Sequence, residues 1–251
     1  VGAFLSKIGF IISILPLLII KNQKLRELII FMILGLFLLT ILLSGERMAS
    51  LLFIMGISLY FLIKTFYNLR SFLYLLLSVV IIAAVFLNSN NILKRFQEIS
   101  HDQYGLTKEF KIKDSVWGAH FLTAYEIFKN YPVVGVGPKN FRIESCKKKY
   151  ENIDSSKSNM RCSTHPHNIV FEILSELGFL GMSIFLLLLY NILKSSNLFR
   201  ETQLLIFLSL LIYIWPIGSS GSIFTSWNGT FLWLNFAVYL FIKKNKNLYF
   251  N

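Results

Sequence analysis

The chain has 251 residues, of which 55% are hydrophobic and only 15% are charged, and its mean hydropathy is +0.60. No soluble chain of this length could bury so much apolar surface, so the composition excludes a soluble globular protein and predicts an integral membrane protein. The formal net charge is +12, but the basic residues lie in short loops and one long loop between apolar segments. This placement fits membrane topology and anionic, phosphate-bearing ligands, and we expect no nucleic-acid partner.

Apolar segments that are long enough to be transmembrane helices lie at residues 4–20, 27–44, 48–63, 72–88, 169–192, 203–217 and 229–242. The predicted fold class is therefore an all-α integral membrane protein: a polytopic bundle of about seven transmembrane helices with a large loop that contains an amphipathic helix. The chain begins at Val1 inside an apolar segment without the layout of a signal peptide, so we expect it to be the C-terminal part of a longer protein.

Basic residues concentrate in alternate connections: Lys21, Lys24 and Arg26; Lys64 and Arg70; Lys194 and Arg200; and Lys243, Lys244 and Lys246. The positive-inside rule places these connections in the cytoplasm and the intervening ones outside. The expected domains are four transmembrane helices in 1–88, a periplasmic loop domain in 89–166, and three transmembrane helices with a cytoplasmic tail in 167–251.

Arg47 does not follow this charge pattern, because it lies at the outer end of a span. A structural explanation is a snorkelling arginine that pairs with Glu46. The alternative explanation is a cation that serves the function of the protein.

A helix is predicted in the long loop, capped by Asp114 and ending before Pro132. One face should carry Trp117, Phe121, Ala124, Tyr125 and Phe128. Such a helix should lie across the outer mouth of the bundle. Lys113, Trp117 and His120 follow one another at spacings of four and three, so their side chains are expected to project together.

Glycines at 135 and 137 follow this helix. They allow tight turns and close approach of the backbone. Such a turn can present amide donors to a phosphate, although a plain structural turn is the commoner use.

Cys146 and Cys162 both fall in the expected outer loop. In an oxidising periplasm they would close a loop of ~17 residues, which stabilises the fold by about 3 kcal/mol and braces the approach to His167. Cys162 with His165 and His167 could also be metal ligands, but no clear fourth ligand appears, and we expect no metal or other cofactor.

A polar loop meets an apolar helix at the segment Cys162-Ser163-Thr164-His165-Pro166-His167-Asn168. Pro166 fits the first turn of that helix and Thr164 or His165 its cap, so the imidazole of His167 should be held at the membrane surface. A histidine that is fixed at a boundary between water and lipid can do acid–base chemistry.

Polar residues recur at helical spacing along the start of this helix, at Asn168, Glu172, Ser175 and Glu176. Carboxylates are costly in hydrocarbon, so this stripe must face protein or water and is a candidate functional surface. The structural alternative is that the two glutamates lie at headgroup depth and only fix the helix in place.

Several of these motifs, taken in order, resemble the O-antigen ligase and O-antigen polymerase superfamily. The matching residues are Arg47, Trp117, Ala124-Tyr125-Glu126-Ile127-Phe128, Tyr131-Pro132, Gly135-Val136-Gly137, Phe141-Arg142, His165-Pro166-His167-Asn168, Glu176-Leu177-Gly178 and Gly181. The resemblance covers most of the chain from Leu25 to about Leu193. It implies that roughly five transmembrane helices precede this sequence in the whole protein.

The resemblance also implies a metal-independent glycosyltransferase of the bacterial inner membrane, whose active face is periplasmic. Its donor would be a polyprenyl-diphosphate-linked glycan, and its acceptor would be lipid A core, a growing glycan or a protein side chain. His167 would be the base and Arg47 a cation for the diphosphate, with inversion at the anomeric carbon as the simplest scheme. Membrane lipids would be the remaining partners.

One position departs from the family pattern. The family often has a second arginine four residues before the tryptophan, where this chain has Lys113. A lysine supplies charge without the bidentate fork that suits a diphosphate, so Arg142 or Arg95 could take over this task. Trp117, His120, His165, Asn168, Glu172 and Glu176 are the expected supporting residues.

Two other functional hypotheses remain open from the sequence. A transporter or flippase for lipid-linked sugars would explain the basic outer surface and the intramembrane carboxylates without requiring His167. The other hypothesis is that the chain is an inactive fragment.

Overall fold

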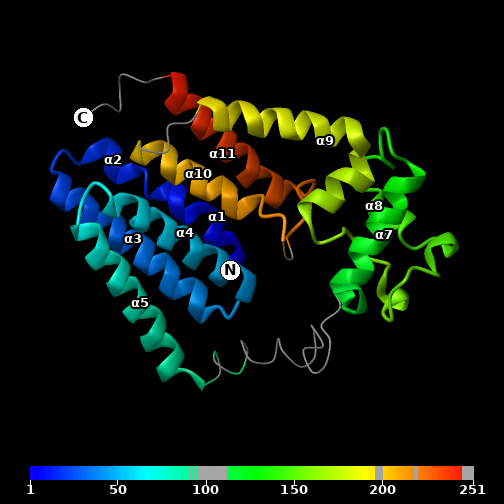
Figure 1. Cartoon of the computed structure of the whole chain (residues 1–251), viewed down its shortest axis with the longest axis horizontal. Coiled ribbons are helices and arrows are strands. Elements are labelled where there is room, and N and C mark those ends of the chain that lie inside the picture. The colour runs from blue at the N-terminus through cyan, green and yellow to red at the C-terminus, as the bar shows by residue number, and fades with distance from the viewer. Residues whose placement is uncertain (91, 93, 95–111, 196–199, 218–219, 245–251) are drawn as a thin grey trace. The chain divides into compact units, whose positions relative to one another are not determined.

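The computed structural model describes residues 1–90, 92, 94, 112–195, 200–217 and 220–244, which form helices and turns without a β-strand (Figure 1). The prediction of an all-helical fold is thereby confirmed for these residues. Arg95 lies outside them. The chain divides into two compact units, which are described separately: unit 1 comprises 1–96, 197–214 and 230–251, and unit 2 comprises 97–196 and 215–229.

Five helical segments are long and apolar enough to cross a membrane: residues 2–19, 23–43, 47–65, 70–88 and 169–194. The described residues therefore give five candidate spans, against the expected number of about seven. α10 (Glu201–Tyr213) is apolar but has only 13 residues. At 1.5 Å per residue it would extend over about 20 Å, which is less than the ~30 Å of a hydrocarbon core.

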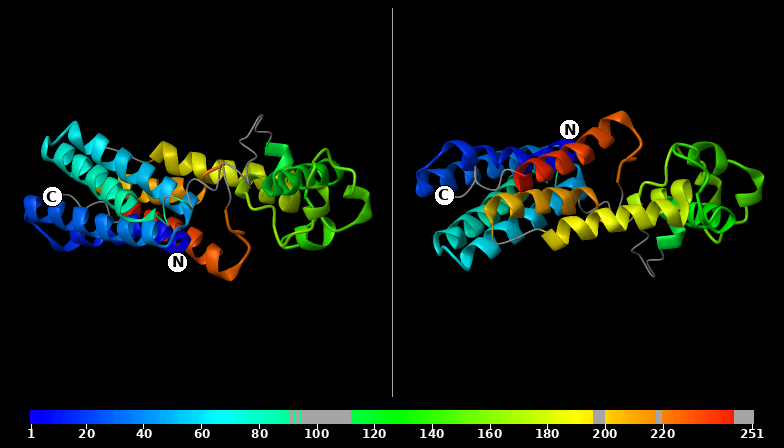
Figure 2. Two further views of the ribbon diagram at one scale, coloured as in Figure 1. Left: turned by 90° about the horizontal axis from the view of Figure 1, so that it is seen from below. Right: turned by 90° about the horizontal axis from the view of Figure 1, so that it is seen from above.

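Unit 1 is a bundle in which α1 (Gly2–Ile12) packs against α3 (Gln23–Leu43), α4 (Arg47–Thr65) and α10, while α4 also contacts α5 (Arg70–Asn88). A short α2 (Leu15–Ile19) follows α1, and unit 1 also holds most of α11 (Ser226–Lys244) (Figures 1 and 2).

Two glycines allow α1 and α4 to approach closely. A Cβ at Gly9 would lie 2.8 Å from the Phe53 ring, and one at Gly56 would lie 2.8 Å from the Phe10 ring. Phe10 and Phe53 are fully buried, with ring centroids 5.0 Å apart. Each ring thus fills the space that the absent glycine side chain leaves on the opposite helix.

Unit 2 contains α7 (Val116–Asn130), α8 (Phe141–Glu144) and α9 (Ile169–Ser195). Three 3-10 turns complete it: η2 (Ile112–Asp114), η3 (Lys148–Tyr150) and η4 (Ser158–Met160). α7 packs along α9. A hydrophobic core of unit 2 is formed by Ala124, Ile127, Phe141 and Tyr150. Because α9 packs on α7, unit 2 includes α9 as well as the described part of the loop that precedes it.

α7 ends before Pro132, as predicted, but its start and its buried face differ from the prediction. Ser115 is the cap, accepting a hydrogen bond from the amide of Gly118, while the carboxylate of Asp114 accepts from the amide of Ser156. Tyr125 was expected on the apolar face but is 47% exposed. Ala119, Thr123 and Ala124 are buried instead of Tyr125. Their small side chains let α7 lie close to its neighbours.

α9 is broken at Gly178, whose backbone has φ 64° and ψ −160°. The carbonyls of Ser175 and Glu176 would accept from the amides of residues 179 and 180 in a continuous helix. They accept from the amides of Val136 and Gly137 at 3.0 and 2.8 Å instead. In return, the amides of residues 179 and 180 donate to the carbonyls of residues 132 and 133 at 2.8 and 3.0 Å.

The break therefore costs α9 two hydrogen bonds and gains four to the loop that follows α7. Two glycines make the crossing possible, because their φ values of +65° at Gly135 and +64° at Gly178 suit residues without a side chain. A Cβ at Gly135 would lie 2.3 Å from the carbonyl carbon of Glu176, and a Cβ at Gly178 would lie 2.5 Å from that of Val133.

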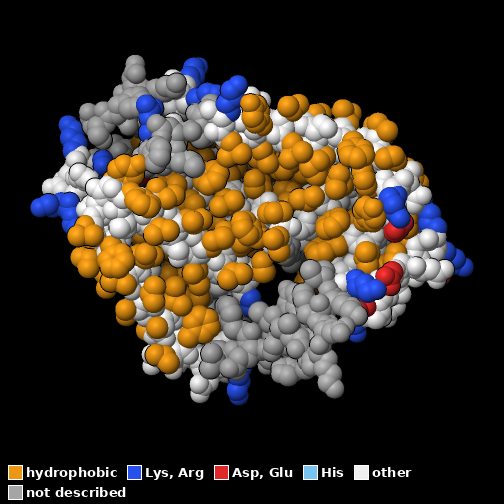
Figure 3. Space-filling model, viewed as in Figure 1, with side chains coloured by type: hydrophobic (Ala, Val, Ile, Leu, Met, Phe, Trp, Pro, Cys, Tyr) orange, Lys and Arg blue, Asp and Glu red, His pale blue; other side chains and the backbone are white. Residues whose placement is uncertain are grey.

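The break also separates two kinds of helix. The buried polar residues of α9 precede it, whereas most side chains that follow are apolar and many are exposed, including Phe179 at 59%, Leu180 at 56% and Ile184 at 61%. Exposed apolar side chains also occur on α3 and α5. Figure 3 shows hydrophobic side chains over much of the face it draws, with Lys and Arg at its margins. Such a surface is suited to lipid.

Replacement of Gly135 tests the crossing of the loop with α9. Gly135→Ala should lower the free energy of unfolding by about 2–5 kcal/mol, because it combines a left-handed backbone with overlap onto rigid backbone atoms. Gly35→Ala is the matched control, since Gly35 is inside a helix and a Cβ there would have its nearest contact at 3.9 Å. Thermal unfolding of the purified protein measures both, and equal effects of the two substitutions would contradict the crossing.

Candidate active site

Three of the four histidines in the sequence lie together in unit 2 with one tryptophan, and we call His120, His165, His167 and Trp117 the histidine cluster. The ring centroid of His167 is 4.0 Å from that of His165, 4.7 Å from Trp117 and 5.2 Å from His120. The rings of His120 and His167 are stacked, with an interplanar angle of 23°. Trp117 and His120 lie near each other as expected, with ring centroids 6.0 Å apart, and the ring of His167 packs against both.

The backbone around His167 is fixed by the start of α9, although not as the sequence predicted. The helix begins at Ile169, and the side-chain oxygen of Asn168 accepts from the amides of Val170 and Phe171 at 3.0 and 3.2 Å. Asn168 is therefore the cap. Pro166 lies before the helix, not in its first turn. His167 itself has φ 59°, a left-handed conformation that is uncommon for a non-glycine residue.

The segment between α10 and α11 holds residues 165–168, which we call the histidine loop, in place. The amide of Ser220 donates to the carbonyl of His167 at 2.7 Å, and Asn168 Nδ2 donates to the carbonyl of Pro216 at 2.7 Å. His165 Nε2 lies 3.2 Å from the carbonyl of Ser220. Pro216 and Ser220 contribute only backbone atoms, so no residue-type signal in the sequence could have identified them.

Each imidazole has a defined partner on at least one nitrogen. A carbonyl can only accept, so Nε2 of His165 carries a proton and its Nδ1 faces the Thr164 hydroxyl at 3.0 Å. By the same reasoning, Nε2 of His120 donates to the carbonyl of Met160 at 3.0 Å. His167 Nε2 lies 3.4 Å from the hydroxyl of Ser163.

The cluster keeps its imidazoles neutral. Burial, and to a smaller extent the nearby His165 and His120, lower the pKa of His167 from 6.5 to about 3. Burial also lowers the pKa of His165 and of His120, although the carbonyls that accept their protons oppose the shift. A neutral His167 has a lone pair available to accept a proton at pH 7.

The polar stripe on α9 is buried against protein: Glu172 and Glu176 are 1% exposed, Asn168 is 2% exposed and Ser175 is fully buried. Glu176 accepts from the backbone amides of Lys139 and Phe141 at 2.5 and 3.0 Å. Glu172 accepts from the amide of Ile223 at 3.0 Å. The carboxylates therefore fix the turn after α7 and the segment before α11 onto α9.

The backbone amides of the glycine-rich turn after α7, which begins at Gly135, donate to atoms of this chain. Its amides at residues 136 and 137 donate to carbonyls of α9, and those of 139 and 141 donate to Glu176. The anion that the turn binds is thus a carboxylate of this chain. The structure favours the structural use of the turn over the phosphate-binding one.

The candidate cations are spread over the described part of the chain. Lys113 forms an ion pair with Asp154 at 2.7 Å, and its side chain is 43% exposed. The grouping of Lys113 with Trp117 and His120 stays a prediction. Arg142 is exposed, and its Nε donates to the carbonyl of Lys139 at 3.0 Å. Neither contact occupies the whole cationic group.

Arg47 is the first residue of α4 in unit 1. The carboxylate of Glu46 does not pair with it, because it accepts from the amides of Gly2 and Ala3 at 3.0 and 2.6 Å and so caps α1. The structural explanation that paired Arg47 with Glu46 is therefore wrong.

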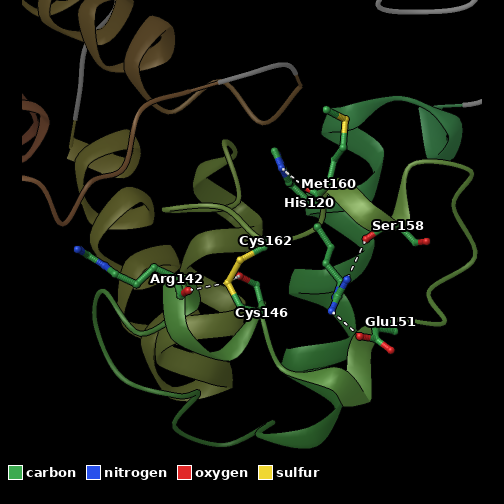
Figure 4. The surroundings of a disulfide bond; sticks show 9 residues. His120, Arg142, Cys146, Glu151, Ser158, Met160 and Cys162 are labelled. Carbon is green, nitrogen blue, oxygen red and sulfur yellow. Dashed lines mark hydrogen bonds and ion pairs between the residues drawn. A yellow bond between two sulfur atoms is a disulfide. The ribbon is translucent and has the colours of Figure 1, made fainter.

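Cys146 and Cys162 are joined in a disulfide, with Cα atoms 4.6 Å apart (Figure 4). The bond connects the end of α8 to the segment that leads into the histidine loop. In Figure 4, Arg142 extends away from this disulfide, and Met160 lies beside His120. The two sulfurs are thereby unavailable as metal ligands, and no group of three or more metal-ligating side chains occurs among the residues that the structure describes.

Comparison with known proteins identifies the family. A family model described as O-antigen ligase matches residues 30–186, which is more than half of the chain, and the chain therefore belongs to this family. The match includes Arg47, the whole of α7 and the histidine loop. No curated protein and no solved structure matches the chain significantly.

The lowered pKa of His167 can be measured directly. Nuclear magnetic resonance titration of labelled histidine should show His167 neutral from pH 7 to about 4, since its pKa is about 3. The unfolded protein should titrate near pH 6.5 and is the reference. Between pH 6.5 and 3 the unfolded state binds more protons than the folded state. The folded state should therefore lose stability as the pH falls from about 6.5 toward 3. A midpoint near 6.5 in the folded protein would contradict the described burial.

Proposed function

We propose that this member of the O-antigen ligase family transfers a glycan from a polyprenyl-diphosphate carrier to an acceptor hydroxyl, at the periplasmic face of the bacterial inner membrane. The observation that carries the proposal is the histidine cluster, in which a neutral His167, one of the residues that match the family model, is held by a backbone hydrogen bond from Ser220. A membrane location is supported by the five apolar helices, and a periplasmic face by the charge asymmetry and the disulfide.

In the proposed reaction, His167 is the general base. Its imidazole takes the proton of the acceptor hydroxyl while the oxygen attacks the anomeric carbon of the donor. A new glycosidic C–O bond forms, and the bond from that carbon to the carrier diphosphate breaks, with its electron pair leaving on the diphosphate. Direct attack of this kind inverts the anomeric carbon, and the cationic charge that the step needs comes from the protein.

The low pKa of His167 sets a condition on this role. A group with a pKa of about 3 is a weak base in the free protein. A bound diphosphate would raise that pKa, because a nearby negative charge favours the imidazolium form. Basicity would thus increase only when the donor is in place, which couples proton removal to departure of the diphosphate.

Arg47 is the proposed diphosphate cation. It begins α4, a helix of 19 residues whose cap residue makes no side-chain hydrogen bond to the first turn. Amides at such a helix start attract anions, and the guanidinium adds a bidentate donor. Lys113 or Arg142 would contribute further charge, and Arg95 is the remaining candidate. Lipid A core, a growing glycan or a protein side chain is the acceptor that this chemistry allows.

Replacement of His167 tests the base. His167→Asn should reduce transfer by about 10²–10⁴-fold, the usual contribution of a general base. Asparagine is the better substitution than alanine, because it tolerates the φ of 59° at this position. His165→Gln is the matched control, since its amide can still donate to the carbonyl of Ser220, and it should lose less activity. Transfer by purified full-length His167→Asn protein at the wild-type rate would remove the base assignment and leave a carrier as the alternative.

Replacement of Arg47 tests geometry separately from charge. Arg47→Lys should lower transfer by about 10–100-fold, because lysine keeps the charge but loses the bidentate fork. Arg70→Lys is the matched control: Arg70 likewise begins an apolar helix, α5, but at an end that the charge pattern assigns to the cytoplasm. Equal activity of the two variants in the purified full-length protein would contradict the diphosphate role of Arg47.

A further inference from the structure

The turn that follows α7 exposes apolar side chains. Val133 is 66% exposed, Val134 is 61% exposed and Tyr131 is 38% exposed, and we call residues 131–134 the apolar turn. Residues 131–138 include no charged side chain, whereas Lys129 and Lys139 flank them. Single exposed apolar residues are common on protein surfaces, so the neighbours of this turn decide what it contacts.

The apolar turn lies directly beside the break in α9. The amides of Phe179 and Leu180 donate to carbonyls of the turn at 2.8 and 3.0 Å. The ring centroids of Phe128, at the end of α7, and Phe179 are 4.9 Å apart. Phe179 and Leu180 are themselves more than half exposed, and they begin the part of α9 whose surface suits lipid. The turn and that part of α9 therefore form one continuous apolar surface.

The length of α9 places its break near the edge of the hydrocarbon core. The whole helix has 27 residues and would extend over about 40 Å if straight, against ~30 Å for the core. Residues 179–195 alone extend over about 26 Å at 1.5 Å per residue. Lys194 lies at the end that the charge pattern assigns to the cytoplasm. With that end at the inner boundary, the break at Gly178 lies within ~5 Å of the outer boundary.

Tyrosines and lysines around the apolar turn fit this depth. Lys149 Nζ donates to the hydroxyl of Tyr131 at 3.3 Å and lies 4.9 Å from the centroid of its ring. Lys129 Nζ lies 5.2 Å from the ring centroid of Tyr125. Tyrosine rings and lysines with extended side chains are suited to the boundary between lipid and water.

The backbone of the apolar turn tolerates contact with lipid. Its carbonyls at residues 131, 132 and 133 accept hydrogen bonds from the amides of residues 135, 179 and 180, and Pro132 has no N–H to satisfy. Unpaired backbone groups are what excludes irregular segments from lipid. The carbonyls of residues 131–133 therefore add no such cost.

We infer that the apolar turn inserts into the bilayer at the outer boundary of the hydrocarbon core, with Tyr131 and Lys149 at the level of the lipid headgroups. The partner of this surface is the bilayer itself, and the contact is independent of the proposed reaction. It also sets the height of the histidine cluster, because residues 169–177 of α9 rise by at most ~14 Å above the break. The cluster then lies outside the hydrocarbon, where a glycan on a lipid carrier would project.

Crosslinking from the lipid tests the contact without a substitution. Purified full-length protein is reconstituted in vesicles of phosphatidylethanolamine and phosphatidylglycerol that contain a phospholipid with a diazirine on its acyl chain. Trypsin cleaves after lysine, so it releases the apolar turn in the peptide 130–139, and the polar peptide 150–157 of the same unit is the control. After illumination, lipid adducts should be about tenfold more abundant on the peptide 130–139, because an apolar side chain prefers lipid to water by at least this factor.

Spin labels measure the depth of single positions in the same vesicles. Val134→Cys and Asn152→Cys each introduce one reactive thiol, because the two native cysteines are joined in the disulfide. Both positions are exposed, and Asn152 lies in the polar loop after η3. Oxygen concentrates in hydrocarbon, whereas a water-soluble nickel chelate is excluded from it. The ratio of collision rates with oxygen and with the chelate should therefore be about tenfold higher at 134 than at 152.

Either measurement can overturn the lipid contact. Equal adduct yields on the two peptides would contradict it, and so would equal collision ratios at the two labelled positions. The crosslinking uses the wild-type chain, so it remains decisive even if Val134→Cys does not fold. Neither measurement depends on transfer activity, so failure of the proposed reaction is distinguished from failure of the lipid contact.

Discussion

The exchange of backbone hydrogen bonds between the turn after α7 and the break in α9 is the interaction on which the rest of unit 2 depends. Four bonds replace the two that α9 loses at Gly178. They fix α7 to α9 through rigid backbone atoms, and the buried carboxylate of Glu176 extends the connection to residues 139 and 141. Because α7 carries Trp117 and His120 while α9 follows His167, this crossing determines how the histidine cluster is assembled.

Within unit 2, the residues that hold loops in place differ from those that form the histidine cluster. Carboxylates and glycines that suggested a chemical role in the sequence hold loops in place, whereas the imidazole rings near the start of α9 pack against one another. Burial keeps these rings neutral, and carbonyls of Met160 and Ser220 fix two of them in a defined tautomer. Neutral imidazoles in defined tautomers can accept hydrogen bonds from hydroxyl groups. In the proposed reaction, the negative charge of the diphosphate would be bound by cations at other positions, with Arg47 as the proposed one.

Much of this fold was predictable because apolar length is a strong signal, and the five helical segments that could cross a membrane follow from it. The end of α7 before Pro132 follows from the restriction that proline places on the preceding residue. The helix starts were misplaced by one to a few residues. Asp114 and Ser115 are both competent caps, and so are Thr164 and Asn168, and only tertiary contacts decide between them. The break at Gly178 was not predictable, since Gly-Phe-Leu-Gly fits an apolar helix and the partner loop lies far away in the sequence. The tautomer of His120 depends on Met160, whose contribution is a backbone carbonyl.

The central proposal is that His167 is the base and Arg47 the diphosphate cation of one transfer reaction. An experimental structure of the full-length protein with a bound polyprenyl-diphosphate-linked glycan tests it most directly. The account predicts diphosphate oxygens within hydrogen-bond distance of the Arg47 guanidinium and the anomeric carbon beside the His167 imidazole. A diphosphate bound away from Arg47, or an Arg47 side chain that faces lipid while the donor lies beside His167, would contradict it.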